Sequence, residues 1–71
     1  MKLKNNIRRC RFDNNEMSQE DLAKKIGVTR QTIYSIEKEK FIPSVLLAIK
    51  LAEFFNKPVE DIFYLRDEDQ V

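Results

Sequence analysis

A single glycine, Gly27, divides the middle of this chain into two short segments that each carry the signs of a helix. Ser18 precedes the first segment and Thr29 precedes the second, and both residue types favour helix N-caps. Glycine after a helical pattern ends the helix, because it takes positive φ angles without strain. We therefore predict two helices within residues 18–37, joined by the tight turn Gly27-Val28-Thr29.

Apolar residues recur at helical spacing in both segments, so that each helix can turn one face toward a core. They are Leu22, Ala23 and Ile26 in the first segment, and Ile33 and Ile36 in the second. Two helices held at a large angle by a short turn that contains glycine form a helix-turn-helix. The sequence predicts this arrangement, with the polar side of the second helix exposed.

Three further helices complete the predicted fold. Residues 5–14 form the first and end at an Asn pair, which favours a turn. Ser44 caps residues 44–55, the most apolar segment, which we expect at the centre of the core. Pro58 opens a short helix over residues 59–63. The fold class is therefore all-α, with five helices in one domain, residues 1–66, followed by an acidic tail, residues 67–71.

The two ends of this domain leave two alternatives open. Residues 1–4 alternate in character, and residues 63–66, Phe-Tyr-Leu-Arg, favour strands. They can pair as a short antiparallel ribbon, or both can fray.

Composition excludes several classes of function. The chain has one cysteine, no histidine and one glycine. A disulfide within the chain, a Cys/His zinc site, a histidine-based triad and a glycine-rich phosphate loop are therefore excluded. We expect no enzymatic activity, cofactor, metal site or small-molecule ligand. No apolar run approaches the roughly 20 residues of a membrane helix, and no signal peptide is recognisable, so we expect a cytoplasmic protein.

The net charge of +1 hides an uneven distribution. Residues 1–40 hold ten basic and six acidic residues, whereas residues 41–71 hold three basic and six acidic residues. The positive half is where a polyanion would dock. Scattered surface charge explains the same numbers, so this feature favours nucleic acid only slightly.

The polar side of the second helix carries residues that can read DNA bases. Arg30 can donate two hydrogen bonds to guanine, Gln31 can pair bidentately with adenine, and Thr32 can offer a methyl group to thymine. Tyr34 and Ser35 share this polar side. A polar helix face is more often simply solvated, and the fixed spacing of caps, glycine turn and following lysines favours the functional reading.

Four other residues are placed to hold the DNA backbone. Lys38 and Lys40 follow the second helix and can neutralise phosphates. Gln19 and Thr29 lie near helix N-termini, where backbone N–H groups favour an anion.

The stretch from Met17 to Phe63 resembles the Cro/repressor-like (Xre) helix-turn-helix family, and most closely its small stand-alone regulators of the cytolysin-repressor type. The matching motifs are Met17-Ser18-Gln19-Glu20-Asp21-Leu22-Ala23, Gly27-Val28-Thr29-Arg30-Gln31-Thr32-Ile33, Ile36-Glu37-Lys38, Pro43-Ser44 and Ala48-Ile49-Lys50-Leu51-Ala52. The resemblance implies a five-helix, lambda-repressor-like DNA-binding domain. It also implies that Arg30, Gln31 and Ser35 face base edges, and that Gln19, Thr29 and Lys38 hold the backbone.

The resemblance further implies a homodimer built from the fifth helix and the loop before the fourth. The corresponding residues are Phe41, Ile42, Val59 and Ile62. Phe41 and Ile42 are apolar residues in a loop, which a small monomer covers with difficulty. The alternative is that these side chains cap the core.

In related repressors an arginine of the first helix pairs with a glutamate at the end of the third, and Arg11 and Glu37 match these positions.

Glu39 stands where Gly or Asn is usual in the family. If its φ is positive, Glu39 costs about 1 kcal/mol, and its carboxylate lies near the expected phosphate track. The turn at residues 14–16 is one residue longer than usual in the family.

Cys10 is expected to be a buried small hydrophobe, with oxidation sensing as the alternative.

These features support two hypotheses of different classes. The first is a sequence-specific transcriptional regulator, a repressor that binds a palindromic operator in double-stranded DNA as a homodimer. The second is an antitoxin-like or adapter module whose main partner is another protein, with DNA binding secondary.

Overall fold

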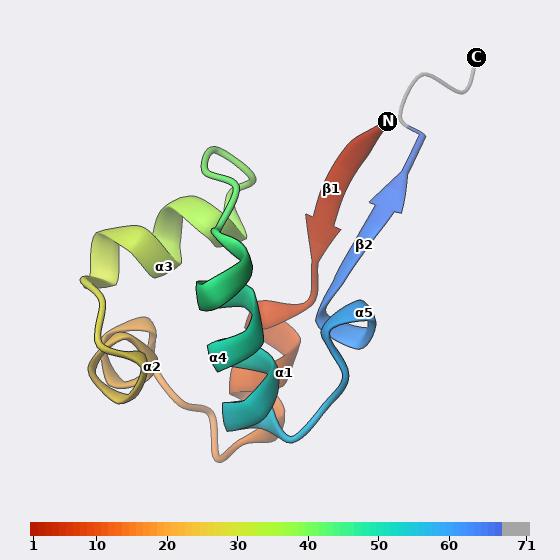
Figure 1. Cartoon of the computed structure of the whole chain (residues 1–71). Coiled ribbons are helices and arrows are strands. Elements are labelled where there is room, and N and C mark those ends of the chain that lie inside the picture. The colour runs from red at the N-terminus through yellow and green to blue at the C-terminus, as the bar shows by residue number, and fades with distance from the viewer. Residues whose placement is uncertain (68–71) are drawn as a thin grey trace.

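The computed structural model describes residues 1–67 and has five helices and a two-stranded sheet (Figure 1). The elements in chain order are β1 (Lys2–Asn5), α1 (Ile7–Asp13), α2 (Gln19–Ile26), α3 (Arg30–Glu37), α4 (Val45–Phe55), α5 (Val59–Ile62) and β2 (Phe63–Arg66). The predicted all-α, five-helix fold is confirmed, with the terminal ribbon present. Of the tail predicted over residues 67–71, only Asp67 is described and it is exposed; the rest lies outside the described residues.

The predicted helix ends are confirmed by their hydrogen bonds and backbone angles. Ser18, Thr29 and Ser44 each accept a hydrogen bond from the backbone N–H three residues further on, at 3.0, 3.2 and 3.1 Å. Gly27 ends α2 with a φ of 91°, and Asn56 ends α4 with a φ of 57°. Local chemistry therefore sets both ends of α2 and α4 and the start of α3.

The first and last helices are shorter than predicted, because the ribbon takes their outer residues. Asn5 lies in β1, where its side chain accepts from the Ile7 N–H at 3.2 Å and donates to the Ile36 carbonyl at 2.9 Å. Phe63 begins β2 and pairs with Asn5 across the ribbon. The predicted helix over residues 59–63 therefore ends at Ile62.

The ribbon is antiparallel and joins the two ends of the described chain. Its register runs from Lys2 opposite Arg66 to Asn5 opposite Phe63. Figure 1 shows that the ribbon projects from the helical bundle on the side of α5, away from α2. The sequence left open whether the two ends pair or fray, and the structure shows that they pair.

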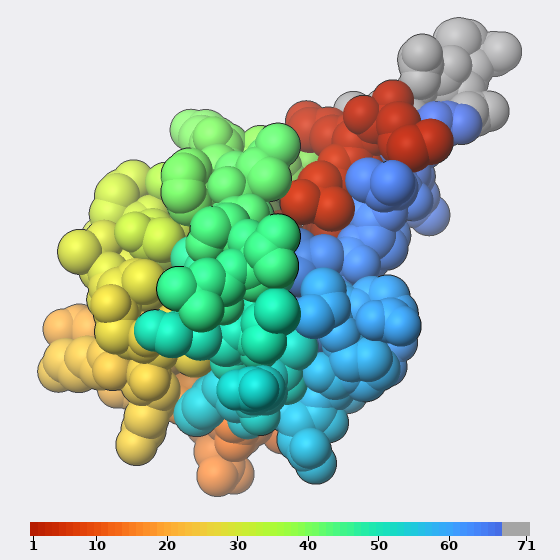
Figure 2. Space-filling model, viewed as in Figure 1, coloured from red at the N-terminus to blue at the C-terminus, as the bar shows by residue number. Residues whose placement is uncertain are grey.

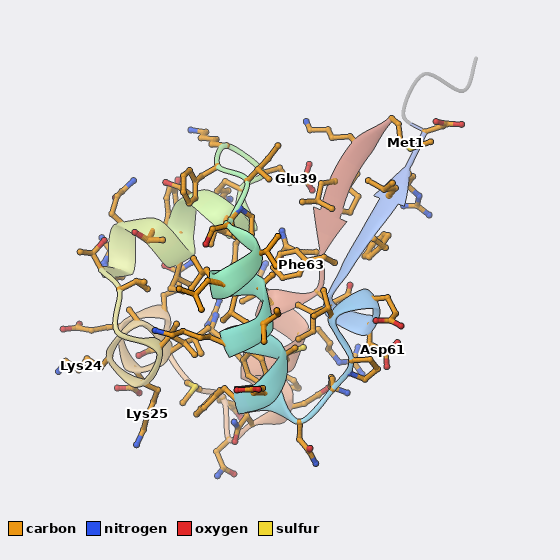
Figure 3. All side chains as sticks on the ribbon, viewed as in Figure 1. Met1, Lys24, Lys25, Glu39, Asp61 and Phe63 are labelled. Carbon is orange, nitrogen blue, oxygen red and sulfur yellow. The ribbon has the colours of Figure 1, made fainter. Side chains whose placement is uncertain are left out.

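One hydrophobic core connects every helix. Its fully buried large side chains come from all five helices and are Ile7, Leu22, Ile33, Ile36, Leu51 and Ile62. Burial of each such side chain stabilises the fold by about 1.5–3 kcal/mol. Phe63, at the base of the ribbon, also enters this core and lies beside α4 (Figure 3).

The expectation that α4 is surrounded by the core is wrong for one of its faces. Only Leu47, Leu51 and Ala52 are buried. Val45 and Leu46 are 76% and 66% exposed, because α4 lies over the bundle and no described element covers its outer side.

The expectation that Ile62 contacts a second copy is also wrong, because its side chain is 0% exposed. The helix α5 is a single turn, and burial of Ile62 is what attaches that turn to the core. Val59 is partly buried against the same core, whereas Phe41 and Ile42 are exposed.

The predicted contact between Arg11 and Glu37 is present and is bidentate. The Arg11 Nε and Nη2 atoms donate to the two carboxylate oxygens of Glu37 at 2.7 and 3.0 Å. The Arg11 Nη1 atom donates to the Met17 carbonyl at 2.8 Å, and the side chains of Arg11 and Glu37 are only 14% and 8% exposed. This nearly buried pair joins α1, the following loop and the end of α3.

Glu39 has a φ of 64°, so the strained backbone considered for this position is real. Its carboxylate lies 3.3 Å from the Lys4 Nζ atom and 3.6 Å from the Lys2 Nζ atom (Figure 3). The carboxylate of Glu39 is thus paired with two lysines of β1. These partly exposed pairs each contribute at most about 1 kcal/mol, enough to offset much of the backbone strain.

Replacing Arg11 by methionine should lower the free energy of unfolding by about 3–5 kcal/mol, because Glu37 is left buried without its cation. Urea denaturation followed by circular dichroism measures this difference. Arg9→Met is the matched control, because Arg9 is exposed and, within residues 1–67, pairs only with Asp13 one turn away. The control should cost less than about 1 kcal/mol. An unchanged melting temperature for Arg11→Met would refute the claim that the pair of Arg11 and Glu37 stabilises the fold.

Burial raises the pKa of the Cys10 thiol; nearby Lys57 lowers it and Asp13 raises it, both less strongly than burial. The unfolded chain then loses this proton first as pH rises, so folding stability falls above the unfolded thiol pKa of about 8.5. As pH rises from about 7.5 to 9.5, we therefore expect the wild type to lose stability relative to Cys10→Ala. Denaturation midpoints of both proteins across this range provide the test, and parallel pH profiles would contradict it.

Candidate nucleic-acid interface

The helices α2 and α3 meet at the turn that Gly27 makes possible. The backbone N–H groups of Gly27 and Val28 both donate to the Ala23 carbonyl, at 2.8 and 3.0 Å. Ala23 is 2% exposed, and its small side chain allows the two helices to approach each other. In Figure 1, α2 is seen nearly end-on and α3 nearly side-on, so the helices lie at a large angle. This is the geometry of a helix-turn-helix, whose second helix enters the major groove.

The outer side of α3 presents the predicted base-reading residues to solvent. Arg30 and Gln31 are exposed, while Thr32, Tyr34 and Ser35 are partly buried. Their inner neighbours Ile33 and Ile36 are held in the core, which fixes the orientation of the helix. The structure therefore places all five predicted residues on one short helix, and the most exposed pair lies at its first turn.

The polar side chains of this surface are joined by weak, exchangeable contacts. Gln31 Nε2 donates to Ser35 Oγ at 3.3 Å, and Arg30 Nη1 donates to Gln19 Oε1 at 3.5 Å. The hydroxyls of Thr29 and Thr32 lie 3.0 Å apart. Such exposed contacts hold the side chains in an ordered array and can be exchanged for hydrogen bonds to base edges at little cost.

The residues predicted to hold the DNA backbone lie around this array. Lys38 and Lys40 are exposed just beyond α3, and the Lys38 ammonium lies 5.9 Å from the centre of the Tyr34 ring. Gln19 begins α2, and its Nε2 atom donates to Glu37 at 3.2 Å. Thr29 caps α3, so its hydroxyl already serves the fold. Gln19 thus connects the buried Glu37 to the exposed Arg30.

A residue that the sequence analysis missed lies next to this array. Arg8 lines a polar hollow of about 390 Å³, together with Asn5, Arg11, Gln19, Glu37 and Lys38. The spacing in the sequence could have indicated Arg8: it stands three residues before Arg11, so both side chains lie on the same face of α1.

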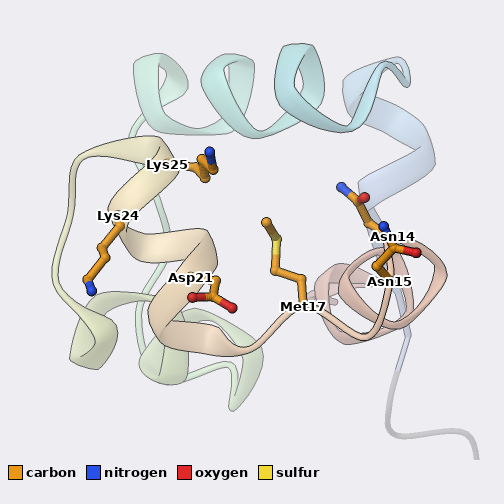
Figure 4. A pocket seen from close by; sticks show the side chains of 6 residues that line it. All are labelled: Asn14, Asn15, Met17, Asp21, Lys24 and Lys25. Atoms are coloured by element: carbon orange, nitrogen blue, oxygen red, sulfur yellow. The ribbon is translucent and has the colours of Figure 1, made fainter.

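A second hollow lies on another side of α2. It measures about 520 Å³ and is lined by Asn14, Asn15, Met17, Asp21, Lys24 and Lys25. Figure 4 shows Met17 and Lys25 turned toward the space between α2, the α1–α2 loop and α4. No residue of α3 lines it, so it is separate from the base-reading surface.

Within residues 1–67, no cluster of acidic, cysteine or histidine side chains could hold a metal ion. Over the same residues, every helix is too short or too polar to cross a membrane.

Comparison with known proteins agrees with this geometry. The pattern of the helix-turn-helix family matches residues 7–62, which is most of the chain. The chain belongs to this family of DNA-binding transcription regulators, which bind double-stranded DNA and are not enzymes.

Relatives in archaea and bacteria carry names of the same kind. The uncharacterised HTH-type transcriptional regulator MJ0272 of Methanocaldococcus jannaschii is 51% identical over 67 residues, covering 94% of this chain and 100% of the relative. The HTH-type transcriptional regulator YgzD of Bacillus subtilis is 44% identical over 69 residues, with the same coverage. An HTH-type transcriptional regulator of Archaeoglobus fulgidus is 53% identical over 53 residues, covering 75% of this chain and 76% of the relative.

Proposed function

We propose that the protein is a sequence-specific transcriptional repressor of the cytoplasm that binds a palindromic operator as a homodimer. The observation that carries this proposal is the outer side of α3. There Arg30 and Gln31 are exposed on a helix whose other side is fixed in the core. Both side chains suit bidentate base contacts in a major groove about 12 Å wide.

An exposed apolar patch supports the homodimer. It lies on α4 and the loop before it, shown in green in Figure 2, and consists of Phe41, Ile42, Val45, Leu46 and Ile49. These side chains are 43% to 76% exposed. A contiguous patch of this kind on a small protein favours a protein interface. The predicted interface is therefore extended along α4. The exposed residues of α4 take the place that the prediction gave to Ile62, which is buried.

The dimensions of the molecule suit a two-fold arrangement on DNA. Half-sites of a palindrome lie about 34 Å apart, one helical turn of DNA. The molecule measures 39 × 23 × 22 Å, a size comparable with that spacing, and we expect two copies in contact to place their α3 helices in the two half-sites. Repression would follow from occlusion, because a dimer bound across an operator covers DNA that other proteins would otherwise reach.

Selection from random duplexes at a fixed, stated salt concentration should enrich a palindrome, which sequencing of the bound fraction identifies. Arg30→Ala combined with Gln31→Ala should abolish the enrichment, because each bidentate contact supplies about 1–3 kcal/mol of discrimination. Weak, salt-sensitive binding without an enriched sequence would contradict the proposal.

The exposed apolar patch also favours a second function, an antitoxin-like or adapter module that binds another protein. In that case the patch holds a heterologous partner, and DNA binding is secondary. A partner that co-purifies in a fixed ratio, together with no enriched sequence in the selection, would favour this function.

Leu46→Lys should convert the dimer to a monomer, because it places a charge in the middle of an apolar interface. Sedimentation equilibrium measures the change, and affinity for the full palindrome should fall at least tenfold while affinity for one half-site stays the same. Phe12→Lys is the matched control: Phe12 is 62% exposed on α1, outside the patch. A wild type that is monomeric at all concentrations, alone and on DNA, would refute the homodimer.

A further inference from the structure

The polar hollow that contains Arg8 is a place where four elements meet. Asn5 contributes from β1, Gln19 from the start of α2, and the charged residues from α1 and the end of α3, namely Arg8, Arg11, Glu37 and Lys38. No apolar residue lines it. The hollow therefore suits a polar or charged ligand rather than an apolar side chain of a partner protein.

We propose that this hollow is a phosphate site of the DNA interface, in which Arg8 and Lys38 bind one backbone phosphate beside the groove that α3 enters. The proposal rests on the proposed function, because it assigns a further contact to the same bound duplex. It adds Arg8, on the first helix, to a surface otherwise made by α2, α3 and the residues that follow α3.

The charge of the hollow favours an anion. Its lining has three cationic side chains and one carboxylate, a net charge of +2. The carboxylate of Glu37 is occupied by two hydrogen bonds from Arg11 and one from Gln19. The positive charge of Arg8 and Lys38 is therefore left to face solvent.

Arg8 differs from the other two arginines of α1. Arg9 pairs with Asp13 at 3.2 Å, and Arg11 pairs with Glu37. Among residues 1–67, Arg8 has no ion-pair partner and its side chain is exposed. A guanidinium without a carboxylate partner is well suited to bidentate binding of a phosphate.

The position of the hollow ties it to the reading surface. Gln19 lines the hollow and also contacts Arg30 at 3.5 Å. Lys38 lines the hollow and begins the segment after α3, where phosphate contacts are expected. We therefore expect a duplex that receives α3 in its major groove to bring a strand of its backbone over this hollow.

The test compares Arg8→Gln with Arg9→Gln, which removes the same charge from the next position of the same helix. Affinity for the selected duplex and for a scrambled duplex is measured at several salt concentrations. For Arg8→Gln, the slope of log K against log salt should decrease by about 0.9, the value for one lost phosphate contact. Affinity for both duplexes should fall about five- to tenfold at 0.1 M salt. Arg9→Gln should leave the slope unchanged.

A third variant, Arg8→Lys, should keep the wild-type slope and lose only part of the affinity, because it keeps the charge without the bidentate geometry. Wild-type slopes for Arg8→Gln, or equal effects of Arg8→Gln and Arg9→Gln, would overturn the phosphate site while leaving the proposed function intact. A wild type that binds neither duplex would overturn the proposed function and this inference with it.

Discussion

The carboxylate of Glu37 is held from two sides, and the position of α3 depends on it. Arg11 grips it bidentately from α1, and Gln19 donates to it from the start of α2. A nearly buried carboxylate tolerates only a few positions of its donors, so these contacts fix the end of α3 against two other helices. The core residue Ile36 then fixes the rotation of α3 about its own axis. The contacts of Glu37 and the burial of Ile36 together set the side of α3 on which Arg30 and Gln31 are exposed.

Local chemistry made much of the fold predictable. The caps at Ser18, Thr29 and Ser44 and the helix stops at Gly27 and Asn56 depend on residues within one turn, so their limits could be read from the sequence. The same holds for the solvent-facing residues of α3, which follow from helical spacing. The contact between Arg11 and Glu37 spans 26 positions in sequence, and only the resemblance to related repressors indicated it.

The features that could not be predicted from the sequence depend on which elements pack against each other in the folded chain. Val45 and Leu46 are as apolar as Leu47, and only the placement of α4 over the bundle decides that they are exposed. Ile62 was assigned to the dimer interface by the resemblance to related repressors, whereas in this chain its side chain is buried and anchors the single turn of α5 in the core. Glu39 was expected near the phosphates, but its lysine partners come from a strand 35 positions away. The polar hollow around Arg8 is formed by residues of four elements that are distant in sequence, β1, α1, α2 and the end of α3.

The pairing of β1 with β2 determines the order in which this protein can fold. The helical turns and the α2–α3 unit form from neighbours in sequence, which is fast. The ribbon joins Lys2 to Arg66, so its closure encloses nearly the whole described chain and carries a large loop entropy. That cost falls only after the helices have packed and shortened the distance between the strands. We therefore expect β1 and β2 to pair late in folding, after the helices have packed.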